Sequence, residues 1–247
     1  MSAIDLNEAD KHEALVNAPL SVAIDEATDR VALAAARPTR GYLGASAIGG
    51  DCERKTQFDW LVDGFVDARQ ARIFGRGHFF EAAMRAQMLQ AGFEFAPDSA
   101  LAFIALDGRL QGHADGLLIA APAMPGIYLQ LPCVWEAKAI KHDGWVRLAR
   151  EGLAKAYPAY LTQVQLYMRF LDKRNPTLFS AVDANTCKAL HFLVPYDETL
   201  VEEAVERAKR VIAATERGDL LRRGHPSPDS WQCKRGCGHA DRCWRYS

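Results

Sequence analysis

The stretch that decides the fold is Val134-Trp-Glu136-Ala-Lys138-Ala-Ile140, an apolar segment carrying two opposite charges two residues apart. Side chains alternate between the faces of a β-strand, so Glu136 and Lys138 share one face and the apolar residues between them take the other. A second segment, Gly112-His-Ala-Asp115-Gly-Leu-Leu118, places an acid between glycines in another expected strand. If the two strands are antiparallel neighbours, the carboxylates of Asp115 and Glu136 meet at the end of the sheet.

Two convergent carboxylates bind a hard divalent cation such as magnesium or manganese, because such cations prefer oxygen ligands. A lysine beside them can orient a water molecule and favour its deprotonated form. Together these groups would form a hydrolytic site for phosphodiesters, where the metal lowers the pKa of the water and neutralises charge developing on the phosphate. Taken alone, Glu136 and Lys138 also fit a cross-strand or surface ion pair.

Two helical patterns place further polar side chains near these strands. On a helix expected from about Gln70 to Gln90, His78 and Glu81 are three residues apart and point the same way. His78 fits a core histidine as well as a metal-facing side chain. In Tyr157–Leu171, Gln163 and Tyr167 are four residues apart on one helical face. Their amide and phenol could hold the attacking water or a phosphate, although such a pair also fits ordinary helix-surface positions.

The order of the expected elements predicts one α/β domain with a cysteine-bearing tail. Strands are expected from Phe93 to Ile140, and a hairpin is expected where residues 179–182 and 189–194 flank Asp183-Ala-Asn-Thr. The amphipathic pattern over Glu198–Arg217 predicts a final helix whose apolar stripe faces the core.

The composition excludes several classes of protein. The chain has 247 residues, of which 49% are hydrophobic and 25% charged, as in an ordinary soluble globular protein. No apolar run approaches the roughly 20 residues that span a bilayer, and residues 1–30 lack the pattern of a signal peptide. The formal charge of -1 gives no global basic field, but Arg207–Arg245 holds ten Lys and Arg against four Asp and Glu. A cytoplasmic protein with a local basic segment is therefore expected.

Three of the six cysteines lie within eleven residues, at Cys233, Cys237 and Cys243. In a reducing compartment, clustered thiols indicate metal binding more often than disulfides. The tail could hold zinc through these three cysteines and His239. Four thiolates, with Cys52 as the fourth, would suit an iron–sulfur cluster or a structural zinc, and Cys52 at a helix start favours the cluster. Cys133 and Cys187 are expected to be buried core thiols.

The ordered set His78 and Glu81, Asp115, Glu136-x-Lys138 and Gln163-x-x-x-Tyr167 resembles the PD-(D/E)XK nuclease superfamily, in particular its RecB-like branch. Cys52 before this core, with the three tail cysteines after it, resembles the iron–sulfur subset, which includes CRISPR-associated exonucleases and phage recombination exonucleases. The resemblance implies a central mixed sheet flanked by helices, with an iron–sulfur subdomain formed by N- and C-terminal segments. It covers about residues 43–245, so we expect a helical extension and linker at 1–42 and a nuclease domain at 43–247, with the tail starting near residue 220.

The resemblance also implies a role for each matching residue. Asp115 and Glu136 would ligate magnesium or manganese, helped by the Ala137 carbonyl, and Lys138 would activate the water. His78 and Glu81 would also ligate the metal, and Gln163 and Tyr167 would support the water or the DNA. The resemblance also implies an iron–sulfur cluster, 4Fe–4S in preference to 2Fe–2S. Its ligands would be Cys52, Cys233, Cys237 and Cys243. The thirteen residues from Ala120 to Pro132 lengthen the hairpin between Asp115 and Glu136, so strand polarity does not transfer from the family.

The expected function is metal-dependent exonucleolytic hydrolysis of single-stranded or end-bearing DNA in a bacterial, archaeal or phage-infected cell. An alternative is a DNA-end-processing or binding subunit of a CRISPR adaptation or recombination complex, with protein partners and little activity of its own. A structural zinc module without nuclease activity is a third. Asp115, Glu136 and Lys138 are all present, which favours the enzyme.

Overall fold

The computed structural model describes residues 16–34, 41–61 and 67–245. The chain divides into two compact units, of which the first comprises residues 1–38 and 65–76. Its described part contains helix α2 (Pro19–Ala34), which has no buried residue, and the beginning of helix α5 (Ala68–Gln90). Asp29 of α2 forms an ion pair with Arg72 of α5. Residues 1–15 and 35–40 of the expected N-terminal extension lie outside the described residues.

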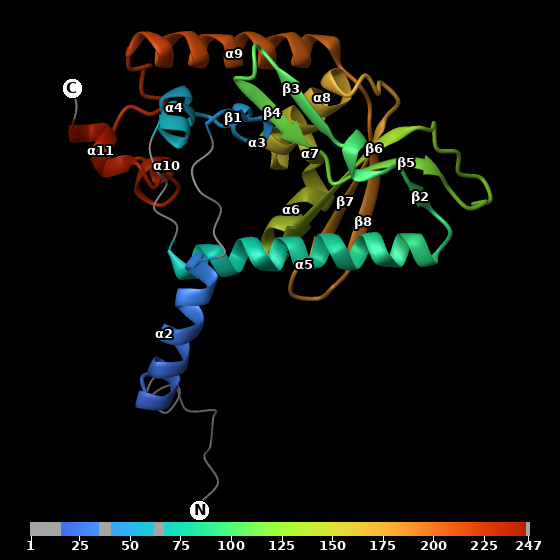
Figure 1. Cartoon of the computed structure of the whole chain (residues 1–247), viewed down its shortest axis with the longest axis horizontal. Coiled ribbons are helices and arrows are strands. Elements are labelled where there is room, and N and C mark those ends of the chain that lie inside the picture. Colours follow the sequence, from blue (N-terminus) through green and yellow to red (C-terminus); the bar gives the residue numbers. More distant parts are fainter. Residues whose placement is uncertain (1–15, 35–40, 62–66, 246–247) are drawn as a thin grey trace, which may run out of the picture. The chain divides into compact units, whose positions relative to one another are not determined.

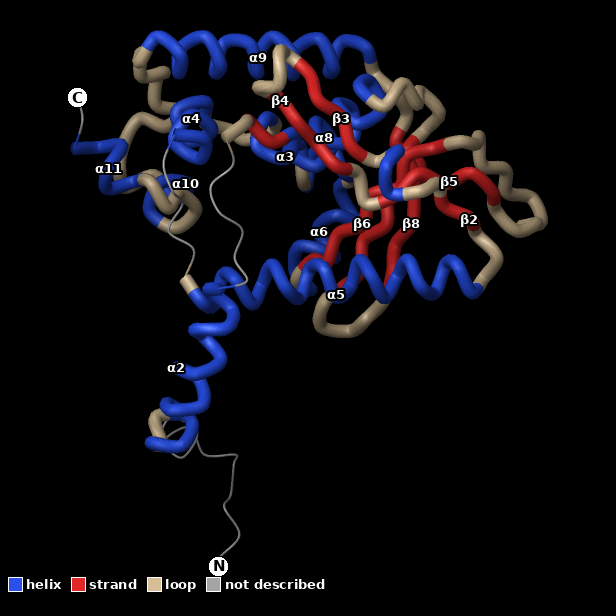
Figure 2. Tube along the Cα trace, in the orientation of Figure 1, coloured by secondary structure: helices blue, strands red, loops and turns tan. Residues whose placement is uncertain are grey.

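The second unit, residues 39–64 and 77–247, contains two β-sheets (Figures 1 and 2). The larger sheet has the order β2-β5-β6-β7-β8, formed by β2 (Glu94–Phe95), β5 (Gly116–Ala120), β6 (Cys133–Ile140), β7 (Thr177–Asp183) and β8 (Ala189–Val194). Its neighbours are antiparallel except β6 and β7, which are parallel. The smaller sheet, β1-β4-β3, is formed by β1 (Leu43–Gly44), β4 (Leu110–His113) and β3 (Ala102–Ala105).

Helices cover both faces of the larger sheet. A parallel pair needs a long crossover connection, and here helices α6 (His142–Glu151), α7 (Leu153–Ala156) and α8 (Pro158–Phe170) join β6 to β7. All seven residues of β7 are buried, as expected for a central strand covered on both sides. On one face the core combines Phe80, Met84 and Met88 of α5 with Trp135, and on the other it combines Leu148, Leu153 and Val164 with Phe179.

Helix α9 (Glu198–Arg217) has the bounds that the sequence predicts. The Asp197 side chain caps its start by accepting a hydrogen bond from the Leu200 N–H at 3.1 Å. Gly218 ends the helix in the left-handed conformation, at φ +77°. The apolar stripe packs against α8 and the smaller sheet, through Ala204, Ala208, Val211, Ile212, Leu166, Met168 and Leu110.

Short helices carry or flank the four cysteines of the expected cluster. Cys52 precedes α4 (Glu53–Leu61), Cys233 lies in α10 (Trp231–Lys234), Cys243 lies in α11 (Ala240–Arg245), and Cys237 lies between α10 and α11. Among the described residues, α3 (Ala45–Ile48) packs against α8, and η1 (Asp98–Ala100) is a 3₁₀ turn. Across the described ranges no helix is both long enough and apolar enough to cross a membrane.

The α/β class and the central mixed sheet flanked by helices are confirmed. The hairpin between residues 177 and 194 is also confirmed. Cys133 is buried as predicted, but the prediction for Cys187 was wrong. Cys187 is exposed in the turn between β7 and β8, at φ +59°, because the strand ends at Asp183 rather than continuing through the thiol.

Candidate active site and cysteine cavity

Asp115 and Glu136 lie on neighbouring antiparallel strands. β5 pairs with β6 in a register that places Asp115, immediately before β5, next to Glu136. The Ala137 N–H donates a hydrogen bond to Asp115 Oδ2 at 2.8 Å. Lys138 Nζ contacts Glu136 Oε1 and lies 3.8 Å from Asp115 Oδ2. The backbone ladder of the sheet therefore holds two carboxylates and an ammonium group together.

Burial makes this cluster electrostatically strong. Glu136 is 0% exposed and the Lys138 side chain 19% exposed. Burial and the neighbouring Asp115 charge raise the pKa of Glu136, although Lys138 opposes the shift. Burial lowers the pKa of Lys138, but the Glu136 and Asp115 carboxylates outweigh that effect and raise it overall, so the ammonium stays charged.

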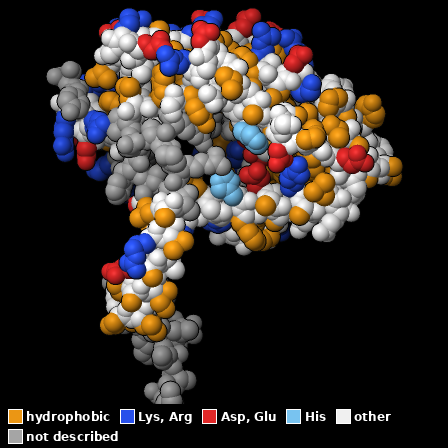
Figure 3. Space-filling view, in the orientation of Figure 1, with side chains coloured by type: hydrophobic (Ala, Val, Ile, Leu, Met, Phe, Trp, Pro, Cys, Tyr) orange, Lys and Arg blue, Asp and Glu red, His pale blue; other side chains and the backbone are white. Residues whose placement is uncertain are grey.

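Helix α5 adds Glu81 and His78 to the edge of the cluster. Burial and repulsion from the Asp115 charge raise the pKa of Glu81. His78 Nδ1 lies 3.6 Å from Glu81 Oε2, and the His78 side chain is 68% exposed. His78 is therefore not a core histidine but lies at the solvent edge. In Figure 3, histidine side chains lie beside a group of acidic side chains on the face shown.

Gln163 and Tyr167 of α8 are buried, so they do not occupy the helix-surface positions that were the alternative prediction. Gln163 Nε2 donates a hydrogen bond to the Tyr167 hydroxyl at 2.8 Å. Burial and the Glu136 charge raise the pKa of Tyr167, which keeps its phenol neutral. Gly112 permits this arrangement, because a Cβ at that position would lie 2.7 Å from the Tyr167 ring.

The carboxylate site, defined here as Glu81, Asp115, Glu136 and Lys138, fits a divalent cation in two respects. Glu136 Oε2 is buried without a hydrogen-bond donor, an arrangement that leaves an acceptor for a ligand. A cation would also relieve the repulsion between the carboxylates. Within the described part of the chain no three His, Cys, Asp or Glu side chains are gathered around one point as ligands of a single ion. Lys138 forms ion pairs with both strand carboxylates.

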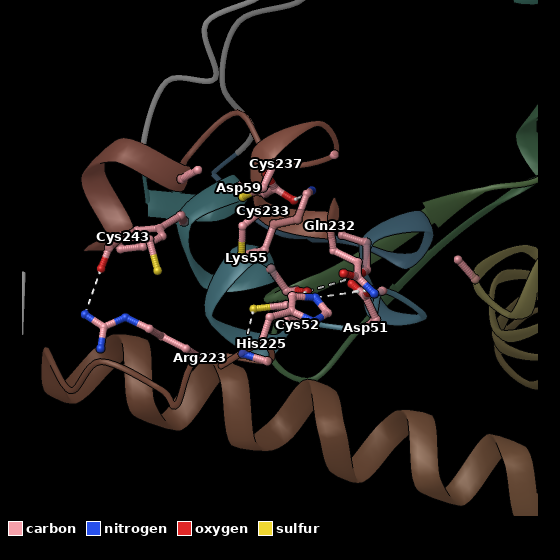
Figure 4. Close-up of a pocket in the computed structure, with 18 of the residues that line it drawn as sticks. Asp51, Cys52, Lys55, Asp59, Arg223, His225, Gln232, Cys233, Cys237 and Cys243 are labelled. Carbon is pink, nitrogen blue, oxygen red and sulfur yellow. Dashed lines mark hydrogen bonds and ion pairs between the residues drawn. The ribbon is translucent and has the colours of Figure 1, made fainter. Parts of the chain in front are cut away.

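The four cysteines of the expected cluster line a single cavity of about 480 Å³ (Figure 4). Cys233 and Cys243 are buried, whereas Cys52 and Cys237 are partly exposed, and all four thiols are free. Cys52 is 181 residues from Cys233 in the sequence, so only the fold brings them to one place. All four thus lie at one cavity, but among the described residues no three of their thiols are gathered closely enough to hold a metal ion.

Residues 219–224, which we call the strap, connect α9 to this cavity. They contact both the segment that carries Cys52 and the tail that carries Cys243. Gln57 of α4 bonds the strap twice, through its Nε2 to the Asp219 carbonyl at 2.6 Å and through its Oε1 to the Leu221 N–H at 3.0 Å. The Gly224 N–H donates to Cys52 Sγ at 3.2 Å. A Cβ at Gly224 would lie 2.8 Å from the Cys52 Cβ, so the strap approaches Cys52 this closely only with glycine.

On the other side of the strap, Arg223 donates to the Cys243 carbonyl at 3.0 Å and lies 4.4 Å from the centre of the Trp244 ring. Arg223, Lys55 and His225 also line the cavity (Figure 4). Asp51 and Asp59 line it too, and they pair with His225 and Lys55 respectively. Neither the strap nor Lys55 was identified from the sequence, although Lys55 follows Cys52 by three residues and shares its side of α4.

His239 does not line the cavity. Its Nε2 lies 2.9 Å from Asp59 Oδ1, and its ring lies 5.7 Å from that of Phe58. Burial raises the pKa of Asp59, but hydrogen bonds from His239 and Lys55 outweigh it and lower the pKa overall. The geometry therefore groups Cys52 with the tail cysteines and directs His239 to a carboxylate.

No protein-family model and no curated protein matches the sequence. Among solved structures, the chain is similar to an alkaline exonuclease (LHK-Exo) from Laribacter hongkongensis, with 16% identity and a TM-score of 0.49, covering 78% of this chain and 93% of that one. LHK-Exo in complex with dAMP gives 17% identity and a TM-score of 0.47 over the same shares. SSO0001 gives 13% identity and a TM-score of 0.48, covering 90% of this chain and 94% of that one.

Proposed function

We propose that this protein is a metal-dependent deoxyribonuclease, an exonuclease acting on single-stranded or end-bearing DNA. The observation that carries the proposal is the buried Glu136 carboxylate, which has one oxygen in contact with Lys138, the other oxygen without a donor, and Asp115 beside it on the next strand. A structural ion pair has no need of a second carboxylate that raises the pKa of the first. A phosphodiester hydrolase does, because its cation needs more than one oxygen ligand.

Each residue of the carboxylate site has a distinct part in this mechanism. Asp115, Glu136 and the Ala137 carbonyl would hold magnesium or manganese, with Glu81 and His78 at the edge. The bound cation supplies a water of lowered pKa and neutralises charge on the phosphate. Lys138 would orient an attacking water with its ammonium group and favour its deprotonated form. The buried hydrogen-bonded pair of Gln163 and Tyr167 supports the water or the DNA strand from α8.

The test is to remove one charge of the cluster at a time. Glu136→Gln and Lys138→Ala should each abolish manganese-dependent DNA degradation while the protein retains its cysteine-bound metal. Glu206→Gln and Lys209→Ala are matched controls, because these residues form an exposed ion pair at 2.7 Å on α9. Undiminished degradation by either active-site variant would contradict the proposal. DNA binding by the wild-type protein without metal-dependent cleavage would instead support the non-catalytic DNA-end-binding subunit.

We also propose that Cys52, Cys233, Cys237 and Cys243 hold an iron–sulfur cluster, 4Fe–4S in preference to 2Fe–2S. Support comes from the shared cavity and from the Gly224 N–H, which already donates to the Cys52 sulfur. A zinc site within the tail alone needs His239, and that side chain is engaged by Asp59. A zinc site of four cysteines would use the same thiolates as the cluster, so metal content decides between the two. Protein purified without oxygen should be brown and contain iron and sulfide. A colourless protein loaded with zinc would refute the cluster.

The tail supports DNA as the partner. Arg222, Arg235, Arg242 and Arg245 are exposed, and within residues 16–34, 41–61 and 67–245 none of them has a side-chain partner. Trp231, 70% exposed, lies among them in the sequence. Unpaired guanidinium groups attract a phosphate backbone, and an exposed indole can stack on an unpaired base.

A further inference from the structure

A stack of aromatic rings lies behind the Lys138 ammonium group. Lys138 Nζ is 5.3 Å from the centre of the Tyr160 ring. The Tyr160 ring is stacked on the Tyr157 ring, with centres 5.0 Å apart and planes 23° apart. The guanidinium carbon of Arg147 lies 5.0 Å from the centre of the Tyr157 ring. Two stacked tyrosines therefore lie between a surface-helix arginine and the proposed catalytic lysine.

The fold holds this stack in place. Tyr157 is the residue before α8 and Tyr160 lies in the first turn of that helix, so the two rings lie on the same side. Arg147 is tied to the end of α7 by a hydrogen bond to the Ala156 carbonyl at 2.8 Å. Gly144 of α6 leaves room for the Tyr157 hydroxyl, because a Cβ at this position would overlap it. The stack is thus braced by α6, α7 and α8 together.

A lysine side chain is long and flexible, and its carboxylate neighbours do not by themselves fix where its ammonium group lies. The face of a tyrosine ring attracts a cation, and the attraction is stronger where water is largely excluded. Lys138 is mostly buried between the carboxylates and this ring. The Tyr160 hydroxyl is not needed for the attraction, and burial raises the pKa of Tyr160, so the phenol stays neutral.

We propose that Tyr160, braced by Tyr157 and Arg147, is a positioning residue that fixes the Lys138 ammonium group over the carboxylate site. The inference rests on the proposed nuclease function of that site. Its consequence is a rate effect without a binding effect, because a displaced ammonium group orients the water poorly while the phosphate and metal ligands stay where they are.

The primary test compares two substitutions of one ring. Tyr160→Phe retains the aromatic face and should have wild-type kcat, whereas Tyr160→Leu should lower kcat about tenfold with unchanged KM for DNA. A Tyr160→Leu variant with wild-type kcat, or one in which only KM rises, would overturn the proposal. A Tyr160→Phe variant as impaired as Tyr160→Leu would also overturn it, because the hydroxyl and not the ring face would then matter.

A second test acts on the stack from a distance and stays informative if Tyr160→Leu does not fold. Gly144→Ala should displace Tyr157 through its hydroxyl and lower kcat several-fold, and adding Tyr157→Phe should restore kcat because the overlapping atom is gone. No loss in Gly144→Ala, or no recovery in the double variant, would count against the stack. Lys138→Ala, run alongside, separates the two proposals. If it is fully active the nuclease site itself is wrong, and if it is inactive while Tyr160→Leu is unaffected only the positioning role fails.

Discussion

The carboxylate site and the cysteine cavity are built in opposite ways. In the carboxylate site Asp115, Glu136 and Lys138 lie on or beside two adjacent strands, and hydrogen bonds of those strands set their separation before any ligand binds. In the cysteine cavity the thiols come from segments 181 residues apart, joined through the strap. A ligand of the first should therefore affect chemistry and leave the fold intact. A ligand of the second should contribute to folding, because it gathers distant parts of the chain.

Removing divalent metal should abolish the activity of the carboxylate site and leave the cysteine cavity unchanged. Excess EDTA should stop DNA cleavage, and added manganese or magnesium should restore it, because carboxylate oxygens exchange a hard cation readily. The visible absorption of the cluster and the Tm should stay unchanged throughout. Cleavage that persists in EDTA with the cluster intact would contradict this separation.

Removing a cysteine from the cavity should lower the stability of the fold first and DNA cleavage only as a consequence. Cys52→Ser should lose the cluster and several kcal/mol of folding stability, at about 2–4 °C of Tm for each kcal/mol. DNA cleavage should decline only as a consequence of the lower stability. Iron, sulfide and zinc per chain, measured without oxygen beside Tm, test this. Cys187→Ser is the matched control, because that thiol is exposed in a turn and should tolerate the change. A Cys52→Ser variant with wild-type metal content would show that Cys52 is not a ligand.

A substitution in the strap should disturb the same cavity less, because it leaves all four cysteines in place. Gly224→Ala would place a Cβ 2.8 Å from both the Asp51 carbonyl oxygen and the Cys52 Cβ, so Cys52 must move, at a cost of about 1–3 kcal/mol. We expect a lower Tm and less iron per chain. Gly238→Ala, in the same tail, adds a Cβ to open space and should change neither. Equal behaviour of the two variants would exclude a close approach of the strap to Cys52.

The smallest expected effect concerns DNA affinity at the tail. Replacing Arg235 or Arg242 by alanine should weaken binding a few-fold and reduce the dependence of log K on log salt by about 0.7–0.9 per phosphate contact. The cluster and the metal-dependent rate constant at saturating DNA should be unaffected. Arg109→Ala serves as the control, because that side chain is paired with Glu216 at 2.8 Å. If the salt dependence is unchanged in both tail variants, Arg235 and Arg242 do not contact the DNA backbone.

Local pattern made much of this fold predictable. The alternation of Glu136 and Lys138 with apolar residues predicted a strand with one charged face, and the helix at 198–217 was predicted to its end residues. Capping explains the second result, because Asp197 and Gly218 mark the helix ends by chemistry that a sequence displays directly. The exposed position of Cys187 in the turn after Asp183 was harder to predict, because a cysteine at positive φ has no recognisable sequence signal.

The sequence by itself determined which chemical groups are present and in what order, because strand alternation, helix periodicity and residue type are local properties. The tertiary structure decided which of these groups share a space. It turned Gln163 and Tyr167 inward, left His78 at the solvent edge and placed His239 against Asp59 rather than beside the thiols. Tyr160 beside Lys138 and Gly224 beside Cys52 depend on contacts between elements distant in the chain. Such contacts follow from how whole helices and sheets pack, and no periodicity within a single segment records them.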